Sequence, residues 1–172
     1  MLAATVAEEL GASVFVAHFG FNNYSEKTVS EILDSLQGTS IKLPVENGQD
    51  LRNFMEFVDR IGSDRLGITV DIDHTRDEDG INPFTKKDRA RKTLAQCGSR
   101  LFHVHLHDFI DRDHYAPLTG DIQWDELFAA FADIDYEGEF MFEAAHPSPE
   151  EVIEKTAAFP MSFVERYWGQ PE

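Results

Sequence analysis

Five short apolar runs, each followed by a segment with helical periodicity, repeat along the chain and restrict the folds open to it. The strand-like runs cover residues 13–20, 41–47, 66–73, 101–108 and 138–144. The helical patterns cover residues 25–34, 49–61, 85–97, 121–132 and 149–166. Strands that alternate with helices form parallel β–α–β units. The repeat therefore predicts an α/β protein built on about five parallel strands.

The chain carries start signals for three of these helices. Asn47 is expected to cap the second helix. Thr85 and Asp88 have the spacing of a capping box before the third helix. Ser148 precedes Pro149, and proline is favoured at the first position of a helix. These signals support the predicted alternation of strands and helices.

Each strand-like run ends in side chains that can bind a metal ion. These side chains are His18, Glu46, Asp71 with Asp73, His105 with His107, and Glu143. Enzymes with a (β/α)₈ TIM barrel build their active sites at the C-terminal ends of several strands. An open sheet would keep residues on its two edges apart. No glycine-rich phosphate loop follows any run, which argues against a dinucleotide-binding sheet. The pattern therefore predicts a TIM barrel.

The length of the chain fits part of such a barrel. A complete barrel takes about 250 residues, whereas this chain has 172 residues. We expect a single domain over residues 1–172 that lacks the first three β–α units of a barrel. Five strands leave two open edges. The sequence then predicts completion by further sequence, pairing with another chain such as a second copy, or marginal stability.

The stretch LFHVHLHDF, residues 101–109, places three histidines at alternate positions. Because side chains alternate along a strand, His103, His105 and His107 face the same way. For the same reason Asp71 and Asp73 share a face of their strand. Burying several carboxylates together is costly unless a cation compensates their charge. A divalent metal ion at the strand ends explains the pattern economically.

Composition limits the partners of the protein. The formal net charge of −17 repels nucleic acids and acidic membranes. The one cysteine, Cys97, leaves no disulfide framework and favours a reducing, cytoplasmic setting. No apolar run reaches membrane-spanning length, and Glu8 and Glu9 stand where a signal peptide would carry basic residues. We expect an acidic, cytoplasmic protein that binds neither nucleic acid nor membranes.

Six short motifs occur in the order and at the spacings of a known family. They are AHFG, PVEN, DIDH, FHVHLHD, DIQW and MFEA. Through these motifs the chain resembles the xylose isomerase-like TIM barrels. That superfamily joins sugar and sugar-phosphate isomerases and epimerases to the AP endonucleases of the endonuclease IV type. The resemblance extends from His18 to Glu143 and covers the family's last five strands.

The resemblance implies a metal site and a reaction. In the one-metal epimerases of this family, four successive strands supply the ligands, and the matching residues here are Glu46, Asp71, His105 and Glu143. Three carboxylates and one imidazole favour Mn²⁺, Mg²⁺ or Co²⁺, with Zn²⁺ as an alternative. Glu46 and Glu143 would exchange protons with the two faces of a sugar or sugar phosphate through an enediolate. Isomerisation and epimerisation share that intermediate, so the sequence predicts this pair of reactions without separating them.

The resemblance also assigns residues around the metal. His74, His18 and Arg112 would contact the substrate, with Arg112 at a hydroxyl or phosphate group. We expect His103 to be a hydrogen-bonded core residue. His107 is expected to lie at the rim of the barrel.

Two other functions stay open at this stage. The endonuclease IV branch binds three zinc ions, and His18, His74 and His114 match positions of that cluster, where they would hold a second metal. Arg112 stands where that pattern has an aspartate ligand, and the net charge opposes DNA binding. The other alternative is a non-catalytic truncated barrel, either a binding protein or the product of a gene start assigned at an internal methionine.

Overall fold

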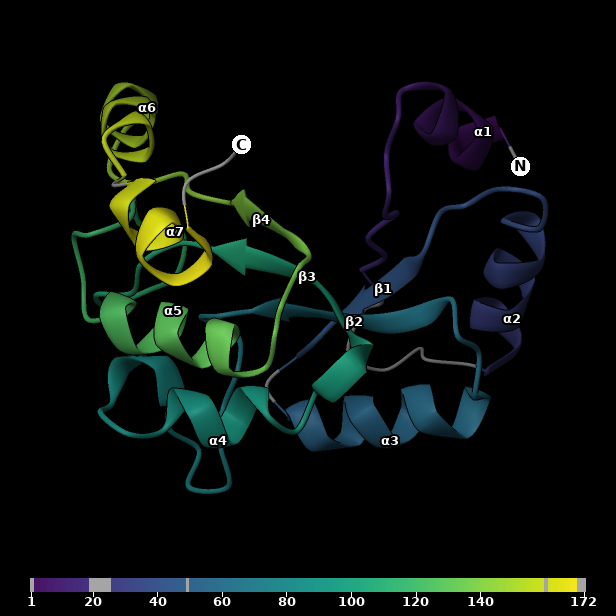
Figure 1. The fold of residues 1–172 in the computed structure, drawn as a ribbon, viewed down its shortest axis with the longest axis horizontal. Coiled ribbons are helices and arrows are strands. Elements are labelled where there is room, and N and C mark those ends of the chain that lie inside the picture. Colours follow the sequence, from purple (N-terminus) through teal and green to yellow (C-terminus); the bar gives the residue numbers. More distant parts are fainter. Residues whose placement is uncertain (1, 19–25, 49, 160, 170–172) are drawn as a thin grey trace.

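Four parallel strands form the centre of the molecule. The computed structural model describes residues 2–18, 26–48, 50–159 and 161–169. The strands lie side by side in sequence order, as Figure 1 shows, and are β1 (Leu43–Glu46), β2 (Leu66–Asp71), β3 (Leu101–Leu106) and β4 (Glu139–Phe142). All three neighbouring pairs are parallel. The predicted α/β fold, a partial TIM barrel, is confirmed.

The first predicted strand pairs with β1 over a short stretch. Isolated parallel bridges join Val14 to Lys42 and Ala17 to Val45. The Ala17 amide donates to the Pro44 carbonyl at 3.0 Å, and the Glu46 amide donates to the Ala17 carbonyl at 3.1 Å. The segment therefore occupies a fifth strand position, and it brings His18 beside the end of β1.

Seven α-helices connect and cover the strands within the described residues. They are α1 (Leu2–Glu9), α2 (Glu26–Ser35), α3 (Leu51–Ile61), α4 (Ala90–Leu94), α5 (Trp124–Asp133), α6 (Pro149–Ala157) and α7 (Met161–Trp168). In Figure 1, α3, α4 and α5 run along one side of the sheet. None of the helices is long and apolar enough to span a membrane, as far as the described residues extend.

The signal for the third helix was misleading. Residues Pro83–Thr85 form a 3₁₀ turn, in which the Thr85 hydroxyl donates to the Asn82 carbonyl at 2.9 Å. Asp88 has a φ of 64°, which a right-handed helix does not allow. The α-helix therefore begins only at Ala90 and is short.

Of the other two predicted helix caps, Asn47 is wrong and Ser148 is confirmed. Asp50, rather than Asn47, caps α3, because its carboxylate accepts the Asn53 amide at 3.3 Å. Asn47 is buried and instead joins the ends of two strands, as its contacts below show. Ser148 caps α6 as predicted, by accepting the Glu151 amide at 3.3 Å.

The core lies between the helices and one face of the sheet. On β3, Val104 and Leu106 are buried on the face opposite the histidines. The helices contribute large apolar side chains, among them Phe54 and Val58 of α3 and Leu127, Phe128 and Phe131 of α5. This packing leaves the histidine face of β3 turned away from α3, α4 and α5, toward the interior of the partial barrel.

Asp108, just after β3, anchors the loop that follows this strand. Its side chain is fully buried and accepts four hydrogen bonds of 2.9–3.1 Å. The donors are the backbone amides of Phe109, Thr119 and Ile122 and the indole nitrogen of Trp124. One carboxylate therefore fixes both ends of the segment 109–122 against the sheet.

We predict that Asp108→Asn destabilises the protein. Each carboxylate oxygen accepts two of the four N–H groups, so an amide nitrogen at either position leaves two donors facing a donor. The expected loss in the free energy of unfolding is about 2–4 kcal/mol, measured by urea denaturation. Asp121→Asn changes an exposed carboxylate of the same loop and should shift stability by less than about 0.5 kcal/mol.

We predict that the buried thiol of Cys97 makes the protein less stable as the pH rises. Burial raises the pKa of its thiol to about 12, whereas the thiol of an unfolded chain ionises near about pH 8.5. The unfolded chain therefore loses the proton first, and stability falls as the pH rises above about 8.5. Between about pH 8 and pH 10, the native protein should lose about 2 kcal/mol more than Cys97→Val. Parallel urea titrations with identical pH slopes would contradict this assignment.

Candidate metal centre

Four side chains converge where the strands end. They are Glu46 at the end of β1, Asp71 at the end of β2, His105 on β3 and Glu143 directly after β4. Each offers one possible ligand atom, and these four atoms lie within 4.8 Å of one another. The parallel register explains the convergence, because Asp71 and His105 are direct partners in the ladder. The four residues predicted as metal ligands are thus together in space.

His105 lies at the centre of the group. Its Nδ1 atom lies 2.7 Å from Glu143 Oε2, 3.1 Å from Glu46 Oε2 and 3.8 Å from Asp71 Oδ2. His105, Glu46 and Asp71 are buried, whereas the Glu143 side chain is 39% exposed. Glu143 is therefore the member of the group that solvent reaches most easily.

Three buried atoms of the group form no hydrogen bond within the described residues, namely Glu46 Oε2 and both ring nitrogens of His105. Glu46 Oε2 and His105 Nδ1 have only ion-pair contacts, and His105 Nε2 has no such contact there. Buried polar atoms rarely stay unpaired in folded proteins. Atoms that point into a common space, at ligand-to-ligand separations, suit a cation between them. A carboxylate-rich set with one imidazole fits Mn²⁺, Mg²⁺ or Co²⁺, so the residues present fit a divalent ion.

The pKa values of these side chains report the same concentration of negative charge. Burial opposes a charge on His105, but the carboxylates of Asp71, Glu143 and Glu46 outweigh it and raise its pKa to about 11. Burial also raises the pKa of Glu46, but His105 and His74 overcome this effect and lower it to about 2. Contact with His105 lowers the pKa of Glu143 as well. The group therefore holds its carboxylates ionised around a positive charge.

Asn47 fixes the end of β2 relative to β1. Its Oδ1 accepts the Asp71 amide at 2.7 Å, and its Nδ2 donates to the Thr75 hydroxyl at 2.8 Å. The Thr75 hydroxyl in turn donates to the Asp71 carbonyl at 2.7 Å. The backbone that carries Asp71 is thereby held on both sides.

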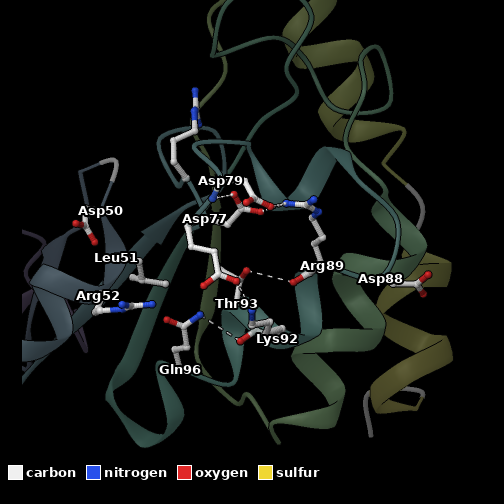
Figure 2. A pocket seen from close by; sticks show the side chains of 12 residues that line it. Asp50, Leu51, Arg52, Asp77, Asp79, Asp88, Arg89, Lys92, Thr93 and Gln96 are labelled. Carbon is white, nitrogen blue, oxygen red and sulfur yellow. Dashed lines mark hydrogen bonds and ion pairs between the residues drawn. The ribbon is translucent and has the colours of Figure 1, made fainter.

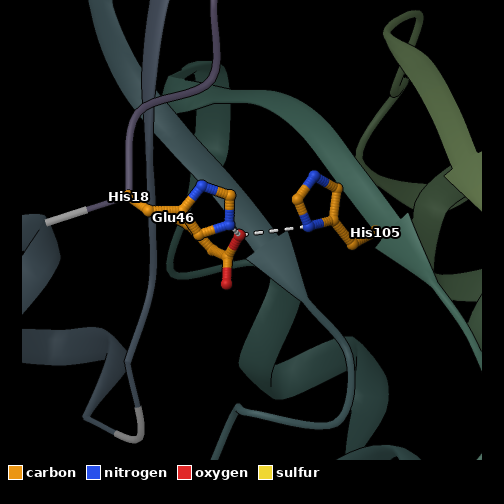
Figure 3. Close-up of side chains that lie close together, drawn as sticks. All are labelled: His18, Glu46 and His105. Atoms are coloured by element: carbon orange, nitrogen blue, oxygen red, sulfur yellow. Dashed lines mark ion pairs between the residues drawn. The ribbon is translucent and has the colours of Figure 1, made fainter. Parts of the chain in front are cut away.

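Two of the predicted substrate-binding histidines lie beside Glu46. His18 forms an ion pair with Glu46, and its own side chain is 62% exposed. Figure 3 shows the Glu46 carboxylate next to both His18 and His105. His74 is partly buried, and its Nδ1 lies 3.2 Å from Glu46 Oε1. This contact with Glu46 raises the pKa of His74 to about 9 against the effect of burial.

The residues predicted to hold a second ion do not form one group. His18 belongs to a cluster with Glu46 and His105, whereas His114 clusters with Asp71 and His107. His74 is in neither cluster among the described residues. The structure therefore divides the three histidines between different neighbourhoods.

Asp113 lies in this region and was missed in the sequence. It contacts His74 Nε2 through Oδ2 and His114 Nδ1 through Oδ1, both at 3.2 Å. Arg112, its neighbour, is exposed and lies 5.7 Å from the ring of Tyr115. Asp113 was missed because the family spacing places an aspartate at position 112, where this chain has Arg112. The signal that could have found it is an acidic residue directly before His114.

The structure corrects the position expected for His107 and the hydrogen bonding expected for His103, while His103 does lie in the core as predicted. His107 is fully buried rather than at the rim. It contacts Asp71 and Asp73, which follow each other closely along the chain, so the loop after β2 covers it. His103 is buried too, but neither of its ring nitrogens has a hydrogen-bond partner. Its ring packs edge-on against that of His105, with centroids 5.3 Å apart.

A separate charged groove lies between the start of α3 and α4. It has a volume of about 420 Å³. Figure 2 shows Arg89 opposite Asp77 and Asp79, and Lys92 also pairs with Glu78. None of the predicted site residues lines this groove. Its opposite charges neutralise one another, so the groove offers no concentrated charge like that of the metal group.

Comparison with known proteins assigns the fold to a family. The family model of the xylose isomerase-like TIM barrel matches residues 1–161. An uncharacterized protein of Methanocaldococcus jannaschii is 30% identical over 156 residues, covering 77% of this chain and 50% of the relative. D-psicose 3-epimerase of Enterocloster bolteae is 33% identical over 89 residues, covering 52% of this chain and 26% of the enzyme. The chain thus spans half or less of the length of these curated relatives.

Solved structures show the same architecture. The crystal structure of a D-tagatose 3-epimerase-like protein matches with a TM-score of 0.69 and 25% identity, over 96% of this chain and 67% of that chain. The IOLI protein, solved with a bound zinc atom, matches with a TM-score of 0.71 and 18% identity, over 98% of this chain and 68% of that chain. The described strands and helices therefore correspond to about two thirds of each of these chains.

Proposed function

Because the chain belongs to the xylose isomerase-like TIM barrel family, we propose that it is a divalent-metal-dependent sugar epimerase. The observation that carries the proposal is the group of Glu46, Asp71, His105 and Glu143 at the ends of four adjacent strands. A relative named D-psicose 3-epimerase and a structure titled D-tagatose 3-epimerase-like protein support a ketose as the substrate class.

The four residues would hold one ion through three carboxylates and one imidazole. Mn²⁺, Mg²⁺ and Co²⁺ suit this set best, and the zinc in the IOLI protein makes Zn²⁺ an alternative. A bound divalent ion supplies positive charge beside the sugar carbonyl and so lowers the energy of the enediolate. Side chains of the protein would transfer the protons and orient the substrate.

Glu46 and Glu143 would transfer the protons. They come from β1 and from the end of β4, and they approach His105 Nδ1 at 3.1 Å and 2.7 Å. Their lowered pKa values keep both as carboxylates at neutral pH, ready to accept a proton from the carbon beside the carbonyl. One glutamate removes the proton from one face of the carbon. The other glutamate, after it has taken up a proton from solvent, delivers that proton to the opposite face, which inverts the carbon, and the first glutamate then releases its proton to solvent.

His74 and His18 would orient the substrate and Glu46. His74 contacts both Glu46 and Asp113, and part of its ring stays exposed, so a sugar hydroxyl can reach it. His18 is more exposed still and lies over Glu46. Arg112 is exposed on the loop after β3, where it would meet a hydroxyl or phosphate group at the far end of a substrate.

We predict that metal binding depends on Glu143 and not on its neighbour Glu139. Glu139 begins β4 and Glu143 directly follows its last residue, so the two residues are four positions apart along the same chain segment. Glu139 is exposed and accepts a hydrogen bond from Ser13. Glu143→Ala should weaken Mn²⁺ binding more than about 100-fold, beyond the effect of losing an outer hydrogen-bond partner. Glu139→Ala should bind Mn²⁺ as the native protein does.

Metal content per chain, measured by elemental analysis after dialysis, completes this test. One equivalent of Mn²⁺, Co²⁺ or Mg²⁺ agrees with the proposal. Two or three zinc ions per chain would favour the endonuclease alternative. A folded native protein that takes up no metal would overturn the proposed function and favour a non-catalytic barrel.

We predict that the Mn²⁺-loaded protein interconverts ketose epimers and exchanges the migrating proton with solvent. In D₂O, D-psicose, D-tagatose or D-fructose should gain deuterium at C3, detected by NMR. Glu46→Gln keeps a side-chain oxygen but cannot accept the proton. Its rate at saturating Mn²⁺ should fall by about 10²–10⁴-fold. Epimerisation without deuterium uptake, or full activity of Glu46→Gln, would contradict the proposed mechanism.

A further inference from the structure

His107 lies between two aspartates next to the metal group. Its Nε2 atom is 3.1 Å from Oδ1 and 3.0 Å from Oδ2 of Asp71. On the other side of the ring, Nδ1 lies 2.9 Å from Asp73 Oδ2 and 2.9 Å from the backbone nitrogen of His114. His107, Asp71 and Asp73 are all buried. None of the proposed catalytic steps uses His107 or Asp73.

The contacts place a proton on Nε2 of His107. In a neutral ring, Nδ1 accepts the amide hydrogen of His114, so the ring proton is on Nε2. In a ring that donates from Nδ1 to Asp73, an unprotonated Nε2 would turn its lone pair toward the Asp71 carboxylate, which is unfavourable, so both nitrogens carry protons. Nε2 therefore donates to the Asp71 carboxylate in either form.

The neighbouring cluster of Asp71, His107 and His114 does not suit a second ion. The rings of His107 and His114 are stacked, with centroids 4.4 Å apart and an angle of 6° between their planes. The lone pairs of imidazole nitrogens lie in the ring plane, so an ion between stacked rings would be out of line with both. Nε2 of His107 is also occupied by its contact with Asp71. The three residues are therefore close together, but their nitrogen and oxygen atoms are not oriented to bind one ion.

We infer that His107 is a positioning residue for Asp71, an inference that rests on the proposed metal-dependent function. Oδ1 of Asp71 accepts the backbone amides of Asp73 and His74, both at 2.9 Å. The N–H of His107 adds a donor from the neighbouring strand, so the carboxylate cannot rotate freely. Oδ2 is thereby turned toward His105, at 3.8 Å from its Nδ1.

Asp73 completes this arrangement from the other side of the ring. Its Oδ2 atom faces Nδ1 of His107, and its Oδ1 accepts a hydrogen bond from Asn82 at 3.3 Å. Asn82 also donates to the Ile72 carbonyl at 3.0 Å, which ties the pair to the end of β2. A metal ligand that its neighbours orient before the ion arrives binds the ion more tightly, and losing such a neighbour costs about 10–100-fold in affinity.

The test is calorimetric titration of metal-depleted protein with Mn²⁺, for three substitutions of His107. His107→Met keeps much of the volume but removes the donor, and His107→Asn carries an amide too short to reach Asp71. His107→Gln places an N–H near the position of Nε2. We expect the Met and Asn variants to bind Mn²⁺ about 10–100-fold more weakly than the native protein. The Gln variant should recover most of that loss, to within about tenfold of native affinity.

His103→Met is the matched control. His103 is buried on β3, four residues before His107, and its ring packs against that of His105 but forms no hydrogen bond within the described structure. Methionine keeps an apolar contact with His105 and no hydrogen bond is lost, so Mn²⁺ affinity should fall by much less than in His107→Met. The melting temperature of each metal-free variant, followed by circular dichroism, separates loss of fold from loss of orientation. If His107→Met does not fold, the comparison of Asn with Gln decides the question, because both are polar and differ by one methylene group.

Each outcome has a distinct meaning. Native-like Mn²⁺ affinity in the Met and Asn variants would overturn the positioning role and leave the proposed function intact. Equal losses in the Gln, Asn and Met variants would overturn it too, because a purely structural role predicts no rescue by glutamine. If the native protein itself does not bind Mn²⁺, the proposed function fails and this inference fails with it.

Discussion

Three carboxylates around one buried imidazole are the arrangement on which this end of the sheet depends. Glu46, Asp71 and Glu143 concentrate negative charge at His105, and all of these side chains except Glu143 are buried. Such a group is unfavourable unless positive charge and fixed hydrogen-bond donors offset the repulsion. His107 is one such donor, since its Nε2 lies 3.0 Å from Asp71 Oδ2. Asn47 acts differently, because its side-chain oxygen accepts the Asp71 amide and so holds the backbone that carries this carboxylate.

The fold and a cluster of polar residues at the strand ends could be predicted from periodicity, whereas the choice of the four central residues within that cluster came from the family resemblance. A parallel sheet brings the C-terminal ends of its strands to the same edge, and a period of two decides which side chains share a face. Polar residues at successive strand ends therefore predict a cluster before any contact is known. The register of β2 and β3 agrees with this expectation, because it makes Asp71 and His105 direct neighbours.

The surrounding residues could not be predicted in this way, because loop conformations decide their places. His107 is buried by the turn after β2. Asp113 contacts His74 from the loop after β3, in which the next residue, His114, has a φ of 62°. Asp50 displaced Asn47 as a helix cap because Asn47 binds across to the end of β2. Spacing along one strand carries no information about such contacts.

Asp108 fixes the ends of the loop over residues 109–122 independently of which residues stand at its tip. One carboxylate holds the segment 109–122 at both ends, while its tip, with Asp111 and Arg112, is exposed. Substitutions at the tip therefore leave the end of β3, and the imidazole of His105, where they are. A lineage of such chains can explore new ligands by varying a few tip positions, without rebuilding the scaffold each time.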